Sequence, residues 1–196
     1  MLKRSSQLQL LKKTKSDYGG ALRNKRSGRA GPRPISTQHS MHLVLRSSKA
    51  TGEWSLLREK NKIKVKEIID RFSRKWGVVV KRMENVGNHL HLHIQITSRH
   101  TYRKFIRAIT GAIAMAVTGA SRRNSLKAIS RQNRPNKLDR FWDLRPFTRF
   151  VTGLKAITIL REYFDLNALE RNGCDRELAK LFVADRKNRV VIDETG

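Results

Sequence analysis

The chain has 196 residues, of which 43 are Lys or Arg and 16 are Asp or Glu, so its formal charge is +27. This excess is larger than solubility requires and predicts a polyanionic partner, for which nucleic acid is the first candidate. The longest uncharged apolar run, residues 108–120, is shorter than the roughly 18–20 residues that cross a bilayer, so we expect no membrane insertion. The single cysteine, Cys174, excludes an intramolecular disulfide framework and a cysteine-based zinc site.

The positive charge is concentrated in two segments. Residues 1–37 carry ten Lys or Arg and one Asp, and their Gly and Pro residues interrupt any regular period, so we expect a flexible basic arm. Such a basic, Ser-containing start is also compatible with an organelle transit peptide. Residues 121–149 carry nine Lys or Arg and two Asp and begin as a loop. We expect one folded domain at residues 38–170 and a mixed-charge C-terminal extension at 171–196.

The predicted elements follow the order strand, helix, strand, strand, helix, strand. This order gives an α+β fold, a ferredoxin-like or RRM-like split βαβ unit (βαββαβ) in which two helices cover one face of an antiparallel sheet. The first and third strands are then central and the fourth lies at an edge, which Pro146 favours because it cannot donate a ladder hydrogen bond. The hydrophobic periodicity predicts strands at 41–46, 78–83, 89–97 and 141–151 and helices at 58–76, 101–118 and 153–169.

The third strand, 89–97, has the clearest alternation in the chain. At period two, His89, His91, His93 and Gln95 lie on one face, which we expect to be open to solvent, and aliphatic residues lie on the other. Imidazoles at positions i and i+2 can reach one divalent ion, and such an ion would polarise a phosphodiester. A solvated polar face without an ion is the alternative.

The last predicted helix carries a second pair of polar side chains. Tyr163 and Asn167 are one turn apart and project from the same side of the helix. A phenol is a potential nucleophile toward phosphate, and an amide oxygen can complete a metal site. The alternative for Tyr163 is a rim residue whose ring packs and whose hydroxyl stays hydrated.

These motifs resemble those of a known family. Asn88-His89-Leu90-His91-Leu92 resembles the His-hydrophobic-His motif of the HUH endonuclease superfamily, and the segment 163–167 resembles the tyrosine helix of its single-tyrosine transposases, the insertion-sequence 200/605-like group. The similarity is greatest to the REP-associated tyrosine transposase branch, and Phe141-Trp142 stands where that branch has an aromatic pair. The resemblance covers about residues 38–170.

The resemblance implies a DNA transposase or endonuclease that cleaves and rejoins single-stranded DNA, usually beside a hairpin, through a 5′-phosphotyrosine intermediate. It implies Mg²⁺ or Mn²⁺ as cofactor, His89, His91 and Asn167 as metal ligands, and Tyr163 as the catalytic nucleophile. A homodimer stays open, because some relatives exchange the tyrosine helix between protomers and Thr152-Gly153 would permit this. We expect a cytoplasmic, nucleoid-associated protein in a bacterial cell.

The chain departs from the family pattern at two positions. Gly87 and Ala168 stand where the family commonly has proline, although neither change removes a reacting group. His93 is additional and either tunes the site or extends the polar face. Imidazole ligands by themselves favour Zn²⁺ or Cu²⁺ over Mg²⁺, so only the resemblance selects Mg²⁺, and Mn²⁺ suits both imidazole and phosphate oxygen.

Basic residues near the predicted sheet are candidates for DNA binding. Cations interleaved with an aromatic side chain suit a single strand, whose bases stack while its phosphates are neutralised. A non-catalytic RNA- or DNA-binding protein that uses the same sheet face is the alternative function, and a small replication initiator of the same superfamily is a third. The candidates are Arg99, Arg103, Lys104, Arg107, Arg145 and Arg149.

Overall fold

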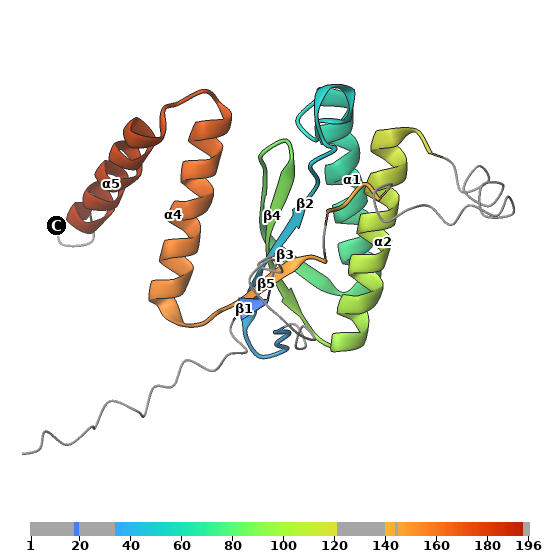
Figure 1. The fold of residues 1–196 in the computed structure, drawn as a ribbon. Helices are drawn as coiled ribbons and strands as arrows, with labels where there is room; N and C mark the ends of the chain where they lie inside the picture. The colour runs from blue at the N-terminus through green and yellow to red at the C-terminus, as the bar shows by residue number, and fades with distance from the viewer. Residues whose placement is uncertain (1–17, 20–33, 121–139, 144, 194–196) are drawn as a thin grey trace, which may run out of the picture.

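The computed structural model describes residues 18–19, 34–120, 140–143 and 145–193 (Figure 1). Most of the predicted basic arm, and residues 121–139 of the second basic segment, lie outside the described residues. None of the helices that the structure describes is long and apolar enough to cross a membrane. In chain order, the elements are β1 (Tyr18–Gly19), β2 (Ser40–Arg46), η3 (Gly52–Trp54), α1 (Glu59–Trp76), β3 (Val78–Asn85), β4 (His89–Ile96), α2 (Arg99–Thr118), β5 (Phe147–Val151), α4 (Gly153–Arg171) and α5 (Arg176–Asp193).

The strands form one antiparallel sheet in the order β1-β5-β2-β4-β3. The two strands predicted to be central, β2 and β4, lie in the middle, and the α+β split βαβ fold is confirmed. The register sets Met41 opposite Ile94 and Val44 opposite His91. Because side chains alternate along each strand, this register separates an aliphatic face from a polar one.

Helices α1 and α2 cover the aliphatic face of the sheet (Figure 1). Helix α1 ends where Gly77 takes a left-handed conformation, with φ of 59°, and its N–H donates to the Ser73 carbonyl. Helix α2 begins at Ser98, whose hydroxyl accepts a hydrogen bond from the Thr101 N–H at 3.1 Å. The core between these helices and the sheet consists of fully or almost fully buried residues, among them Leu43, Leu45, Val65, Ile69, Leu90, Leu92, Ile94, Phe105, Ile109 and Ile113.

Helix α4 lies over the other face of the sheet, and α5 packs on the outer side of α4 (Figure 1). The expectation that the histidine face is open to solvent is therefore wrong, since His91 and His93 are buried. Phe164 is 1% exposed and anchors α4 on this face, with Leu160 and Val151 beside it. The C-terminal extension, whose role the sequence did not indicate, supplies the helix that supports α4.

The fourth predicted strand is shorter than expected. It begins at Phe147 rather than at residue 141, because the preceding segment turns toward the helical layer. Phe141 is buried in the core, and the Trp142 indole donates to the Thr110 carbonyl at 2.9 Å. The two-residue strand β1 pairs with Arg149 and Thr148, so β5 is not the outermost strand. Pro146 precedes β5 and leaves its ladder intact.

Candidate active site

The polar face of the sheet brings together histidines from two neighbouring strands. His89, His91 and His93 alternate along β4, and His42 lies on β2, directly opposite His93. The His42 ring leans toward His91, and a 3.0 Å hydrogen bond joins His42 Nε2 to His91 Nδ1. Their ring centroids are 5.2 Å apart and stacked, and the His89 ring is 4.6 Å from that of His91. His91 is therefore the centre of the cluster.

Helix α4 places Tyr163 against this cluster. The Tyr163 ring meets His91 edge to face at 5.2 Å between centroids and meets His42 at 5.9 Å. Tyr163 is 37% exposed, whereas the next residue, Phe164, is buried. The sequence-predicted nucleophile and one predicted metal ligand are thus neighbours, although they are 72 positions apart in the chain.

Two buried polar atoms at this face have no hydrogen-bond partner among the residues that the structure describes. They are Nε2 of His91 and Nδ2 of Asn167, which follows Tyr163 by one helical turn and is 7% exposed. A buried polar group without a partner costs free energy, so native structures provide one in the great majority of cases. A cation or an N–H donor could pair with Nε2 of His91, whereas Nδ2 of Asn167 is a donor and needs an acceptor such as a phosphate oxygen, which leaves the Asn167 amide oxygen for a cation.

Burial keeps the imidazoles of the cluster neutral. Burial lowers the pKa of His91 to about 3, and the neighbouring His42 and His89 contribute to this lowering. Burial, the Arg149 guanidinium and His93 lower the pKa of His42 to about 4. The pKa of His89 is lowered by partial burial and by Arg46. At neutral pH these rings therefore retain a nitrogen lone pair, which a metal ligand requires.

The donors at the face suit a divalent cation that is held in part by its substrate. The Nδ1 atom of His89 bonds the Asn88 side-chain oxygen, which leaves Nε2 of His89 for a ligand. Among the described residues, no group of three or more His, Cys, Asp or Glu side chains could hold a metal ion. A third protein donor would therefore be an amide oxygen, as Asn167 can provide, and phosphate oxygens would complete the coordination.

His93 has a different partner from the rest of the cluster. Its Nε2 atom shares a 2.8 Å hydrogen bond with the Ser40 hydroxyl, on β2. The pKa of His93 is lowered, mainly by burial and to a lesser extent by the positive charges of Lys81 and Arg161. His93 thus extends the polar face along the strand away from His89.

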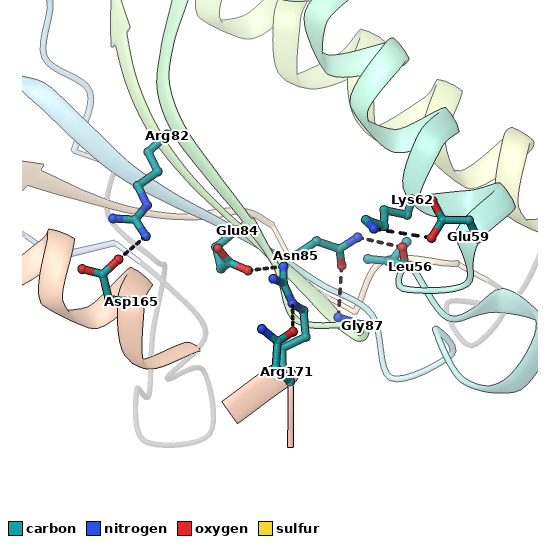
Figure 2. A network of polar contacts seen from close by, with 10 residues as sticks. Leu56, Glu59, Lys62, Arg82, Glu84, Asn85, Gly87, Asp165 and Arg171 are labelled. Atoms are coloured by element: carbon teal, nitrogen blue, oxygen red, sulfur yellow. Dashed lines mark hydrogen bonds and ion pairs between the residues drawn. The ribbon is translucent and has the colours of Figure 1, made fainter. Parts of the chain in front are cut away.

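Four ionisable residues that the sequence analysis did not single out attach α4 to the edge strand β3. Arg82 pairs with Asp165, and Arg171 pairs with Glu84, each at 2.5 Å between nitrogen and oxygen (Figure 2). The Arg82 guanidinium also lies 5.3 Å from the centre of the Phe164 ring. Glu84 lies opposite His91 in the sheet register. These pairs fix the side of α4 that carries Asn167 and Tyr163.

His42 is the site residue that sequence reasoning missed. The signal was present in Met41-His42-Leu43-Val44-Leu45, where alternation places His42 on the face opposite to the buried Met41, Leu43 and Leu45. A single polar residue within a short apolar run gives this signal little weight without the register of the neighbouring strand.

The predicted DNA-binding cations lie on both sides of the sheet. Arg149 lines a cavity of about 270 Å³ between β5 and α4, together with His42 and Tyr163. Arg145 is exposed just before β5. Arg99, Arg103, Lys104 and Arg107 are exposed on α2, in the helical layer on the opposite side of the sheet from α4 (Figure 1). The structure therefore does not bring the α2 cations together with Tyr163.

Comparison with known proteins identifies the family. Residues 35–165 match the model of the family described as IS200-like transposases. Since this match covers more than half of the chain, the protein belongs to the IS200-like transposase family. A comparison with curated protein sequences gives no match.

Two solved structures are similar to the chain at low sequence identity. One is a protein of Deinococcus radiodurans R1 assigned as a transposase, with 18% identity and a TM-score of 0.39, over 70% of this chain and 95% of that one. The other is the REP-associated tyrosine transposase bound to a REP hairpin, with 11% identity and a TM-score of 0.49, over 73% of this chain and 74% of that one.

Proposed function

We propose that this transposase cleaves and rejoins single-stranded DNA, with Tyr163 as the nucleophile and His89, His91 and Asn167 as ligands of a divalent cation. The observation that carries the proposal is the contact of the Tyr163 ring with His91, whose buried Nε2 atom has no partner within the described part of the chain. A nucleophile beside a neutral ligand nitrogen suits a metal-assisted attack on a phosphodiester.

The proposed step exchanges one phosphate ester for another. The Tyr163 oxygen, having lost its proton to water, forms a bond to the phosphorus, and the bond from phosphorus to the 3′ oxygen breaks. The electron pair stays on the 3′ oxygen, which takes up a proton and leaves as a free 3′-OH. The 5′ side of the DNA remains attached to Tyr163 as a phosphotyrosine. Attack by a 3′-OH on this ester reverses the step and rejoins a strand.

The proposed cofactor is Mg²⁺ or Mn²⁺, which would polarise the phosphate and offset its developing charge. His42 would orient His91, and the paired β3 and α4 residues would hold Tyr163 over the phosphate. We propose a hairpin-forming single strand as substrate, from the resemblance of the motifs at 88–92 and 163–167. A homodimer and a nucleoid-associated location remain predictions on the same basis.

The non-catalytic alternative needs an accessible sheet face. RNA-binding sheets of this type expose aromatic side chains on which bases stack. Here α4 covers the corresponding face, and the side chains beneath it include the buried His42, His91 and His93. This cover supports the enzyme over the alternative.

The test is covalent trapping with Mn²⁺ and a pool of single-stranded hairpins. We expect the unmodified protein to nick DNA and to become attached to it, and Tyr163→Phe to abolish both, because the substitution removes only the attacking oxygen. Tyr102→Phe is the matched control, since Tyr102 is buried on α2 across the sheet, and it should retain attachment.

A second variant separates catalysis from binding. His89→Ala combined with His91→Ala should abolish attachment but leave binding measured without metal largely intact. Attachment that survives Tyr163→Phe would eliminate Tyr163 as nucleophile, and metal-independent binding without attachment in any protein would support the non-catalytic alternative.

A further inference from the structure

The cavity between β5 and α4 has walls that the proposed chemistry does not use. Its volume is about 270 Å³, and Tyr163 forms part of its lining. Three polar side chains, those of His42, Arg149 and Tyr163, share the lining with apolar ones. The apolar wall consists of Phe147, Phe150, Val151, Ala156, Ile159 and Leu160.

The two sides of the cavity come from elements that the fold holds in place. Arg149 and His42 are directly opposite each other on β5 and β2, so the guanidinium and the imidazole lie side by side on the polar face. The Phe147 ring lies edge to face with His42 at 6.2 Å between centroids. On α4, Ala156 and Leu160 are one turn apart and pack against Val151. The sheet side of the cavity therefore presents the rings of His42 and Phe147, and the α4 side presents small or aliphatic side chains together with the Tyr163 ring.

This lining matches one chemical class better than others. A phosphate alone would be bound by cations and N–H donors and would gain nothing from six apolar residues. A nucleobase has apolar faces that stack on aromatic and aliphatic side chains, and polar edges that accept hydrogen bonds from a guanidinium. Because Tyr163 belongs to the lining, a base in the cavity would belong to a nucleotide close to the attacked phosphate.

We infer that this cavity binds a single nucleobase of the substrate strand, that of the nucleotide next to the phosphate attacked by Tyr163. The identity of that strand rests on the proposed function, but the binding itself requires neither metal nor cleavage. The site would exclude water from one side of Tyr163 and fix the strand register, so that the adjacent phosphate lies at the hydroxyl.

The test uses a backbone-only probe, a twelve-residue abasic deoxyribose-phosphate strand, and the same strand with one adenine, guanine, cytosine or thymine at its centre. Binding to the full-length protein is measured without metal by fluorescence anisotropy. Charge attracts both probes equally, so the difference in their affinity measures the effect of the base. We expect at least one base to tighten binding about tenfold or more.

The variant Ala156→Phe fills the cavity and should remove this difference while leaving the affinity for the abasic strand unchanged. Thr158→Phe is the matched control, because it adds the same ring to an exposed position of α4 outside the lining, and it should keep the difference. Circular dichroism verifies that each variant is folded, and Ala156→Met fills the same space with a flexible side chain if Phe prevents folding.

The outcomes separate this inference from the proposed function. An unmodified protein that does not distinguish the two probes, or an Ala156→Phe protein that still does, would overturn the base site. Either result would leave the proposed covalent attachment to hairpins unaffected, because that reaction is measured separately. Conversely, a tenfold effect of the base without attachment to any DNA would refute the phosphotyrosine chemistry and leave the base site in place.

Discussion

His91 shares a hydrogen bond with His42 through Nδ1, which leaves Nε2 as the ring nitrogen that can bind a ligand. A neutral imidazole has one N–H and one lone pair, so a free lone pair on Nε2 requires the proton on Nδ1. That N–H then donates to Nε2 of His42 at 3.0 Å. Partners of this kind orient ligating histidines in metal sites, and their removal lowers metal affinity about 10- to 100-fold.

We therefore expect His42→Ala to weaken Mn²⁺ binding by about this factor, as measured by calorimetry on DNA-free protein. His42→Gln should restore part of the affinity, because its amide oxygen can accept the His91 N–H. The control is His93→Ala, which removes a buried imidazole that bonds Ser40 instead and should leave Mn²⁺ affinity unchanged. Equal decreases in His42→Ala and His93→Ala would show that His42 has only a packing role.

At the residue scale, short motifs in the sequence predict which residues meet on the polar face, and the roles assigned to them stay predictions. His89, His91, Tyr163 and Asn167 were selected from spacing and from resemblance, and the structure places Tyr163 against His91. His42 was missed because its role depends on the register between β2 and β4, which no local pattern encodes. The α2 cations are predicted to bind DNA from their charge alone, although the predicted topology already places α2 on the face opposite the histidines.

At the scale of elements, the length of helix α4 depends on a residue that departs from the family pattern, Ala168. A proline at position 168 would lack the N–H and would clash with the preceding turn, so it would disrupt the helix near Asn167. With Ala168, α4 continues to Arg171, whose guanidinium reaches Glu84 on β3 (Figure 2). Gly87 is explained in a similar way, since its φ of 95° is closed to proline.

The pair between Glu84 and Arg171 is expected to serve position rather than stability. Burial raises the pKa of Glu84, and this effect exceeds the opposing influence of Arg171 and Arg82. At a pH below the ordinary pKa of a glutamate, the Glu84 carboxyl is neutral in both the folded and the unfolded state. As pH rises through the raised pKa, the folded protein must hold a charge that its site disfavours, so stability decreases.

Glu84→Gln is neutral at every pH, so its thermal midpoint should rise relative to that of the unmodified protein between pH 4 and pH 8. The cations left behind are not stranded in the interior, because the side chains of Arg171 and Arg82 are 28% and 33% exposed and can be hydrated. Arg171→Gln should do the opposite, because it removes the cation that partly offsets the burial of Glu84. A Glu84→Gln protein whose thermal midpoint lies below that of the unmodified protein, by an amount that grows with pH, would contradict this interpretation of the pair.

At the scale of the whole molecule, the sheet divides the positive charge between two surfaces. Arg149 and the proposed base site lie on the α4 side, whereas the four α2 cations lie in the helical layer beyond the core (Figure 1). Lys104 there lies 4.9 Å from the centre of the Trp76 ring, which Lys75 also approaches. From this placement of the cations we predict that DNA contacts both surfaces.

This division predicts a dependence on DNA length. Replacing the four α2 cations by Gln should leave the affinity for an eight-nucleotide single strand unchanged, because such a strand can lie entirely on the α4 side. Affinity for a long hairpin should fall, and the slope of log K against log salt should decrease by about 0.7–0.9 for each phosphate that the variant no longer neutralises. Arg149→Gln should weaken the binding of both probes. If the quadruple variant loses affinity for the short strand in proportion to its loss for the long hairpin, a single DNA path crosses both surfaces. The salt slopes of the two probes distinguish that outcome from a general decrease in charge attraction.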